Sequence, residues 1–572
     1  MNYCKYIFPN QTKQQMKFSK PLLFIGGILA GFLLAFTVIQ DKDAPITKEM
    51  VKSAASIIGL EFTEAERDTM TSALENTRED LQAIRVMNLN NSTPPALVFN
   101  PVPVGKEFNF DQSDPVFDLS NNADLPSNRD DLAFYTVAEL STLIRDQKIT
   151  SVELTEFFLD RIETYDEQLE AIITVTRERA LEQAARMDEE LESGTYRGPL
   201  HGIPYGAKDL LAVEGYKTTW GAMPYKDQVI HETASVVSKL DEAGAVLIAK
   251  TTLGALAYGD IWFGGRTNNP WDLEQGSSGS SAGSASGTAA GLFPFAIGTE
   301  TLGSIVSPST RNGATGLRPS YGRVSRHGAM ALSWTMDKIG PITRSVEDAA
   351  IVFDAIRGPD NIDQSLIDLP FNYNAETDLS DLRIGYLKSA FERDYYNKER
   401  DNAVLDVLRD MGVELIPITL PEFQTGPLLL TLYAEGAAAF DQLTLSNKDD
   451  LMQWQSPNAW PNTFRAARFI PAVEYINANR ARFELIQKME DEVMSQVDVY
   501  VTPAFGNANL LITNLTGHPS VVLPNGFTDE ERPTSITFTG DLFDEASLLR
   551  VAKAYQEATD HHKKHPPLFS SQ

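Results

Sequence analysis

The chain carries GTETLGSIVSPSTRNG at residues 298–313, and GSSGSSAGSASG lies just upstream at residues 276–287. Both stretches are rich in glycine and in hydroxyl side chains. Polar low-complexity sequence of this kind often forms a flexible linker. Here the two stretches lie close together in the middle of a long chain, and apolar runs flank the first of them. We therefore interpret them as two loops of one active site.

Short apolar runs alternate with helical patterns around these loops. The runs predict buried strands at 245–250, 382–387, 413–418 and 497–501. The patterns between them predict helices, for example at 346–357 and 399–411. Alternation of strands and helices over this length favours an α/β fold, with a sheet covered by helices on both faces.

The part of the chain before the main domain divides into two segments. Residues 45–87 carry apolar residues at helical spacing and predict helices, whereas residues 88–130 are rich in Asn, Pro and Asp and predict an extended connector. Two capping boxes then predict helix starts, at Thr136 with Glu139 and at Thr150 with Glu153. We therefore expect an N-terminal segment at 1–44, a helical extension and connector at 45–130, and the main domain at 131–572.

The N-terminal segment contains PLLFIGGILAGFLLAFTVI at residues 21–39, which is uncharged and apolar. At 1.5 Å per residue, a helix of this length nearly spans the hydrocarbon core of about 30 Å. Lysines precede it and aspartates follow it, so the N-terminus is expected to stay cytoplasmic while the rest is exported. We expect a membrane anchor with an extracytoplasmic domain. A cleaved signal peptide is the alternative, although Ala35-Phe36-Thr37 matches a cleavage site poorly.

Charge and composition limit the partners. The 572 residues include 78 acidic and 49 basic ones, for a net charge of −29, so we expect no nucleic-acid partner. The only cysteine is Cys4, which excludes disulfides and cysteine metal sites within one chain. The body of the protein has no spaced histidine pair, and we predict neither a metal nor another cofactor. The sequence does not indicate the oligomeric state.

Two familiar motifs occur in imperfect form. GAVLIAKT at 244–251 nearly matches a phosphate-binding loop, but Ala249 replaces its second glycine and the residues between read as a strand. Residues 279–283 match G-x-S-x-G with Ser281 as the nucleophile of an α/β-hydrolase with a Ser-His-Asp triad. No apolar strand precedes this motif, as a nucleophile elbow requires. The hydrolase remains an alternative.

Serine chemistry with lysine as the base is a third possibility. A serine hydroxyl needs a base to become a good nucleophile. A lysine serves if it is neutral, and burial favours its neutral form. Lys208 follows a turn rich in Gly and Pro, in GPLHGIPYGAKDLL at 198–211, where a side chain can be directed into a cleft.

At this point the sequence resembles the amidase signature family over about residues 133–550. Six ordered segments carry the resemblance: LHGIPYGAKD at 200–209, GSSAGSASGTAAG at 279–291, GTETLGSIVSP at 298–308, GLRPSYGRVSRHG at 316–328, GPITRSVEDAA at 340–350 and TNLTGHPSVVLPNGF at 513–527. The resemblance implies one large mixed β-sheet covered by helices on both faces, and no cofactor.

The resemblance also implies a Ser–Ser–Lys triad. Matched residue by residue, Ser304 is the nucleophile, Ser280 the bridging serine that follows a cis peptide after Gly279, and Lys208 the base. The backbone N–H groups from Thr301 through Leu302 and Gly303 to Ser304 are expected to form the oxyanion hole.

The chain departs from the family pattern beside the nucleophile. Leu302 stands where the family has glycine, Val306 where it has arginine, and Glu300 where it has aspartate. Arg311 could restore a positive charge near Ser304, or could pair with Glu300 or Asp337; the sequence leaves these possibilities open. Arg311 and Gly279 are our candidates for substrate binding.

We therefore expect an amidase that hydrolyses a small-molecule amide or a peptide amide to an acid and ammonia or an amine. An A-type subunit of a glutamine-dependent amidotransferase, which releases ammonia from glutamine, is the alternative within the same family. Aromatic residues at 458–472, in NAWPNTFRAARFIPA, are the first candidates for a pocket wall, although most aromatic residues of this region are expected in the core.

Overall fold

The computed structural model describes residues 44–119, 123–375 and 378–570. By its internal contacts the chain forms two compact units, Met1–Asn88 and Leu89–Gln572. The predicted membrane segment at 21–39 lies outside the described residues. Within the described ranges, no helix combines the length and the apolar character that crossing a bilayer requires. The expected boundaries at 44/45 and 130/131 stay predictions.

The described part of the first unit consists of two helices, α2 (Lys48–Ile57) and α3 (Glu64–Arg85). Thr63 and Glu66 form a capping box at the start of α3, so that two free N–H groups of the first turn are satisfied. The prediction of helices between residues 45 and 87 is confirmed.

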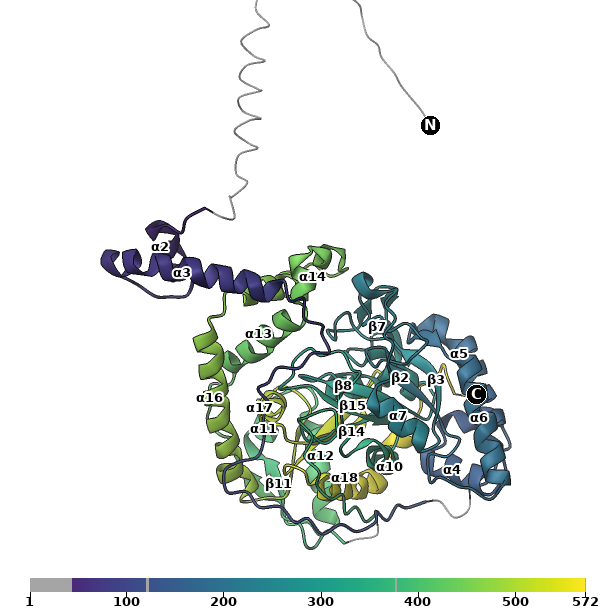
Figure 1. Cartoon of the computed structure of the whole chain (residues 1–572). Coiled ribbons are helices and arrows are strands. Elements are labelled where there is room, and N and C mark those ends of the chain that lie inside the picture. Colours follow the sequence, from purple (N-terminus) through teal and green to yellow (C-terminus); the bar gives the residue numbers. More distant parts are fainter. Residues whose placement is uncertain (1–43, 120–122, 376–377, 571–572) are drawn as a thin grey trace, which may run out of the picture. The chain divides into compact units, whose positions relative to one another are not determined.

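The second unit is built on one mixed sheet of 11 strands, which lies at its centre in Figure 1. The strand order is β1-β3-β2-β8-β10-β9-β14-β15-β13-β11-β12. The strands are β1 (Ile172–Val175), β2 (Pro204–Lys208), β3 (Val246–Thr251), β8 (Phe295–Glu300), β9 (Thr315–Arg318), β10 (Lys338–Thr343), β11 (Ile384–Leu387), β12 (Ile416–Ile418), β13 (Val499–Pro503), β14 (Ser520–Phe527) and β15 (Pro533–Gly540). Two small hairpins pair β4 (Ile261–Trp262) with β5 (Gly265–Arg266) and β6 (Asn268–Asn269) with β7 (Asp272–Gly276).

Helices surround this sheet (Figure 1). They are α4 (Val137–Arg145), α5 (Ser151–Leu169), α6 (Arg177–Glu192), α7 (Ser235–Glu242), α8 (Ala282–Ala289), α9 (Val306–Asn312), α10 (Val346–Ile356), α11 (Lys388–Glu392), α12 (Lys398–Asp410), α13 (Leu430–Ala439), α14 (Asp441–Leu445), α15 (Trp460–Ala467), α16 (Ala472–Met489), α17 (Asn509–Thr516) and α18 (Glu545–Thr559). Every residue of β2, β3, β8, β10 and β13 is buried, which requires that both faces of the sheet are covered. The predicted fold class is confirmed.

The local predictions also agree with the structure. The four expected strands correspond to β3, β11, β12 and β13, and the two expected helices to α10 and α12. Both capping boxes are formed, with Thr136 and Thr150 each accepting a hydrogen bond from the backbone N–H of the glutamate three residues later. These signals are local, and the tertiary structure preserves them.

Two parallel strands determine where the polar loops meet. β2 and β8 pair in parallel, with Tyr205 opposite Phe295 and Ala207 opposite Ile297. Their carboxyl ends therefore share one edge of the sheet, the edge at which ligands bind in open α/β sheets. Lys208 ends β2, and residues 301–304 follow β8 at the same edge.

Candidate active site

The side chain of Lys208 ends in a wholly buried polar cluster. The residue is 0% exposed, and its Nζ lies 2.8 Å from Ser280 Oγ, 3.0 Å from Ser281 Oγ and 2.9 Å from Thr299 Oγ1. The carbonyl oxygen of Thr299 lies 3.4 Å away. Gly279 and Ser280 are joined by a cis peptide bond, as the resemblance implies.

All of these partners are uncharged, and Lys208 has no ion pair among the described residues. Burial lowers the pKa of Lys208 well below its usual value, and the more distant charges of Asp337 and Glu300 oppose this only in part. The environment therefore favours a neutral amine.

Ser281 has a structural role beside Lys208. Its hydroxyl accepts the N–H of Thr299 at 3.1 Å and donates to the C=O of the same residue at 3.1 Å. The residue is 0% exposed and directly precedes the first residue of α8. A hydroxyl held in this way does not reach a substrate, so the alternative with Ser281 as the nucleophile of an α/β-hydrolase is not supported.

Ser304 lies in the loop that follows β8 and is 8% exposed. Gly303 before it has φ +85°, a conformation that favours glycine. The serine-rich loop is tied to this loop by the N–H of Ser281, which donates to the C=O of Ser304 at 3.1 Å, and by the hydroxyls of Ser278 and Ser307, 2.8 Å apart. In the described structure no hydrogen bond joins the hydroxyls of Ser280 and Ser304 directly, so one link of the predicted relay is closed and the other is open.

The backbone of the loop that carries Ser304 leaves its donors free. In the described part of the chain, the N–H groups of residues 301–304 donate to no other residue, whereas those of Ile305 and Val306 donate to Glu300 Oε2 at 2.8 and 2.9 Å. Nearly all buried backbone N–H groups are hydrogen-bonded in folded proteins, so several consecutive free donors indicate an anion site.

Glu300 holds this loop in place. Its Oε1 accepts from Arg318 Nη1 and from Asn514 Nδ2, both at 2.8 Å. Burial raises the pKa of Glu300, but the charge and hydrogen bond of Arg318, helped by the N–H of Val306, lower it to about 2. An ionised carboxylate thus fixes the two residues that follow Ser304.

The expectations for Arg311 are corrected by the structure. Arg311 lies in the last turn of α9, is exposed, and donates to Gln275 Oε1 at 3.1 Å. Arg318 is the partner of Glu300, while Asp337 accepts from the hydroxyl of Thr301 at 2.6 Å. The reason is geometric: α9 turns the side chain of Arg311 away from the buried edge at which Ser304 lies.

A cavity of about 820 Å³ opens at Ser304, and we call it the Ser304 cavity. Its wall includes residues of the two polar loops, namely Gly279, Thr301, Leu302, Gly303, Ser304 and Ser307, and the larger side chains Leu429, Leu430, Leu432, Tyr433, Trp460, Ile470, Phe505 and Leu510. None of its lining residues is Asp, Glu, Lys or Arg. Gly279 is thus part of the wall, and a Cβ there would lie 1.8 Å from the carbonyl oxygen of Gly259.

The segment singled out in the sequence contributes a large part of this wall. Asn458, Trp460, Asn462, Thr463, Ala466 and Ala467 all line the Ser304 cavity, mostly from α15. Of the aromatic residues in 458–472, Trp460 lines the cavity, whereas Phe464 and Phe469 do not, and Arg311 does not line it either.

Thr299 and the clamp formed by Glu300 were not foreseen from the sequence. Thr299 lies on β8, two residues after Ile297, which is the partner of Ala207 on β2, so the parallel register of the two strands is the signal that brings it near Lys208. The pairing of Glu300 with Arg318 had no local signal, because β10 lies between β8 and β9 in the sheet.

The fold and the site together define an enzyme that acts on carbon–nitrogen amide bonds. A family model described as Amidase matches residues 153–513. The glutamyl-tRNA(Gln) amidotransferase A subunit of Coxiella burnetii is 33% identical over 480 residues, which cover 76% of this chain and 99% of that protein. The chain belongs to the amidase signature family.

Solved structures give the same result. The peptide amidase of Stenotrophomonas maltophilia superposes with a TM-score of 0.67 at 30% identity, covering 76% of this chain and 99% of that chain. An amidase family protein of Bacillus anthracis superposes with a TM-score of 0.67 at 27% identity, and the alignment covers 76% of this chain and 92% of that chain.

Proposed function

We propose that the protein is an amidase that hydrolyses uncharged, largely apolar carboxylic acid amides to an acid and ammonia or an amine, with Ser304 as nucleophile, Ser280 as the bridging serine and Lys208 as the base. The observation that carries this proposal is the buried amine of Lys208, which has only uncharged partners and lies 2.8 Å from the hydroxyl of Ser280.

The hydrogen bonds of the cluster favour Ser280 over Ser281 as the bridging serine. A neutral amine has two N–H groups and one lone pair. Ser281 gives its proton to the carbonyl of Thr299 and can only accept from Lys208. Of the two serines, Ser280 keeps its proton for the lone pair of the lysine, and this makes it the donor in a proton relay.

The reaction then proceeds in two stages. Lys208 takes a proton from Ser280, Ser280 takes one from Ser304, and Ser304 Oγ attacks the amide carbonyl. When the C–N bond breaks, the relay returns a proton to the leaving nitrogen. Water then attacks the acyl-enzyme and gives a proton to the relay. When the ester bond breaks, the relay returns this proton to Ser304 Oγ and the acid leaves. The open link between Ser280 and Ser304 is expected to close in the substrate complex, since catalytic hydrogen bonds are often long without substrate.

The free N–H groups of residues 301–304 are suited to the oxyanion of the tetrahedral intermediate. Each donor of this kind typically contributes about 2.7–4 kcal/mol to transition-state stabilisation. Glu300 keeps the loop in the required conformation through the N–H groups of Ile305 and Val306.

The lining of the Ser304 cavity favours hydrolysis of apolar amides over hydrolysis of glutamine. Free glutamine carries an ammonium and a carboxylate, and burying either without a partner of opposite charge is costly. The lining of the cavity provides no charged side chain, and Leu302 adds an apolar one where the family has glycine. Amides with an apolar acyl group fit this wall better.

We further propose that residues 21–39 anchor the enzyme in a membrane with its catalytic domain on the extracytoplasmic side. The uncharged span between lysines and aspartates supports this orientation. Fractionation of the full chain and of a variant lacking residues 1–43, with protease added to intact cells, tests it. Recovery of the full chain in the soluble cytoplasmic fraction would refute the anchor.

The activity itself is tested with a serine-directed fluorophosphonate and a panel of amides. We expect the label on the peptide that contains Ser304, and turnover of phenylacetamide at least tenfold faster than that of glutamine. Ser304→Ala should lose both the label and the activity, whereas the control Ser193→Ala, at an exposed serine that does not line the Ser304 cavity, should keep both. Labelling of Ser281, or hydrolysis of glutamine alone, would overturn the proposal.

A further inference from the structure

A second cavity of about 200 Å³ lies behind the nucleophile loop. Three segments far apart in the sequence surround it: residues 91–99, residues 326–339 and residues 362–365. Unlike the Ser304 cavity, it has charged residues in its wall, namely Arg326, Asp337, Lys338 and Asp363.

The two cavities adjoin each other at the nucleophile loop. Ala257, Thr301 and Leu332 line both of them. Thr301 is the first residue of the loop that carries Ser304, so the two cavities share a wall in the loop that holds the proposed nucleophile.

The second cavity also reaches the lysine side of the relay. Thr299 lines it, and Thr299 Oγ1 lies 2.9 Å from Lys208 Nζ. The leaving nitrogen of an amide must face the group that returns its proton, and in the proposed relay this proton comes from the side of Lys208 and Ser280. We propose that the second cavity binds the amine portion of the substrate, an uncharged polar substituent on the amide nitrogen, while the Ser304 cavity binds the acyl portion; this inference rests on the proposed function.

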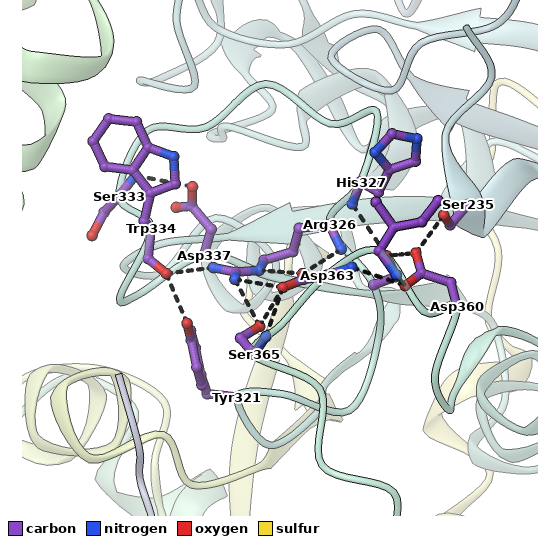
Figure 2. A network of polar contacts seen from close by, with 12 residues as sticks. Ser235, Tyr321, Arg326, His327, Ser333, Trp334, Asp337, Asp360, Asp363 and Ser365 are labelled. Atoms are coloured by element: carbon purple, nitrogen blue, oxygen red, sulfur yellow. Dashed lines mark hydrogen bonds and ion pairs between the residues drawn. The ribbon is translucent and has the colours of Figure 1, made fainter. Parts of the chain in front are cut away.

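The polar groups of the second cavity indicate what it accepts. Arg326 is already occupied: it pairs with Asp363 at 3.0 Å and also donates to the carbonyl of Trp334 and to Ser365, as Figure 2 shows. Asp337 accepts only from neutral donors, the hydroxyl of Thr301 and the N–H groups of Leu332 and Ser333.

Lys338 also lies in the wall of the second cavity. Its amine contacts the carbonyl of Met336 and has no ion pair among the described residues. Burial lowers the pKa of Lys338 and raises that of Asp337, so both groups are shifted toward their neutral forms. A cavity that holds one closed ion pair and two groups biased toward neutrality suits hydrogen-bonding substituents without a charge.

Residues 91–99 form one wall of the cavity and are held at both ends. The side chain of Asn91 donates to the carbonyl of Ala331 and accepts its N–H, both at 2.8 Å. At the other end, Phe99 packs edge-on against Tyr321 and lies under Arg482, whose guanidinium carbon is 3.6 Å from the ring centroid. Pro94 and Pro95 stiffen the segment between these points.

The inference is tested with two substrates that share one acyl group. Phenylacetamide releases ammonia, whereas cleavage of N-phenylacetylglycinamide at the phenylacetyl carbonyl releases glycinamide, an amine with a polar, uncharged substituent. Both reactions are followed by the phenylacetate released, so that hydrolysis of the terminal carboxamide is not counted. Ala331→Leu fills the second cavity at a residue that does not line the Ser304 cavity, and Ile362→Trp does the same from another segment. Ala466→Leu is the matched control, because Ala466 lines only the Ser304 cavity.

We expect Ala331→Leu to lower kcat/KM for N-phenylacetylglycinamide at least tenfold and to change that for phenylacetamide less than twofold. Ala466→Leu should lower both values alike. If the Ala331→Leu variant does not fold, the same comparison is made with Ile362→Trp: kcat/KM for N-phenylacetylglycinamide should fall at least tenfold, and that for phenylacetamide should change less than twofold. Equal effects of the cavity-filling change on both substrates, or a wild-type enzyme that cleaves phenylacetamide but not the glycinamide derivative, would overturn the inference alone. A wild-type enzyme that cleaves neither would refute the proposed function, and the inference with it.

Discussion

Two lysines on adjacent strands of the sheet, Lys208 on β2 and Lys250 on β3, are both fully buried, but their surroundings differ in charge. Lys250 Nζ lies 2.7 Å from Asp209 Oδ1. Lys208 has only hydroxyls and a carbonyl around it. Burial lowers the pKa of both lysines; for Lys250 the charge of Asp209 offsets part of this, and for Lys208 the pKa falls well below its usual value.

The difference shows that burial alone does not make a base. A neighbouring carboxylate favours the ammonium form of a buried lysine, whereas neutral hydroxyls around a buried lysine leave the neutral amine favoured, and this form can take a proton. Lys250 is the lysine of the sequence that nearly matched a phosphate-binding loop, and the structure gives it a place in a strand instead.

Removing the amine of Lys208 is expected to have the largest effect on activity. We predict that Lys208→Met lowers kcat for phenylacetamide by about 10³-fold or more, since general-base catalysis contributes about 10²–10⁴-fold. Steady-state kinetics measures this, and thermal unfolding checks that the fold is intact. Turnover within tenfold of the wild-type value would remove Lys208 from the mechanism.

The matched change at the other lysine should act on stability. Lys250→Met leaves Asp209 buried without its partner, and we predict a loss of about 3–5 kcal/mol in the free energy of unfolding. The folded fraction should keep kcat within about threefold of the wild-type value. Denaturant titration measures the first effect, and Lys250→Met combined with Asp209→Asn should recover part of the loss. Unchanged stability would show that this ion pair does not support the fold.

The sequence was sufficient where the signals are local. Apolar runs, helical spacing and capping boxes predicted the strands and helix starts, and the ordered motifs led to Lys208, Ser280 and Ser304. The structure brings Lys208 and Ser280 into contact and places Ser304 in the adjoining loop, bonded through its carbonyl to Ser281.

The choice of ionic partners lay beyond the sequence. Arg311 is close to Ser304 in the chain, yet Arg318 pairs with Glu300 because the fold of the sheet, and not the sequence separation, sets which charges meet. The second cavity had no signal either, because residues 91–99, 326–339 and 362–365 come together only in the folded chain.

The protonation state of Lys208 tests the central claim most directly. With lysine labelled by ¹³C at Cε, NMR follows each amine through a pH titration, and Lys208→Met and Lys250→Met assign the two signals. We predict that the amine of Lys208 loses its proton well below the pH at which exposed lysines do, with kcat/KM falling as it takes the proton up again at lower pH, while Lys250 keeps its proton to higher pH than Lys208. A signal of Lys208 that remains that of an ammonium up to pH 9 would contradict the account.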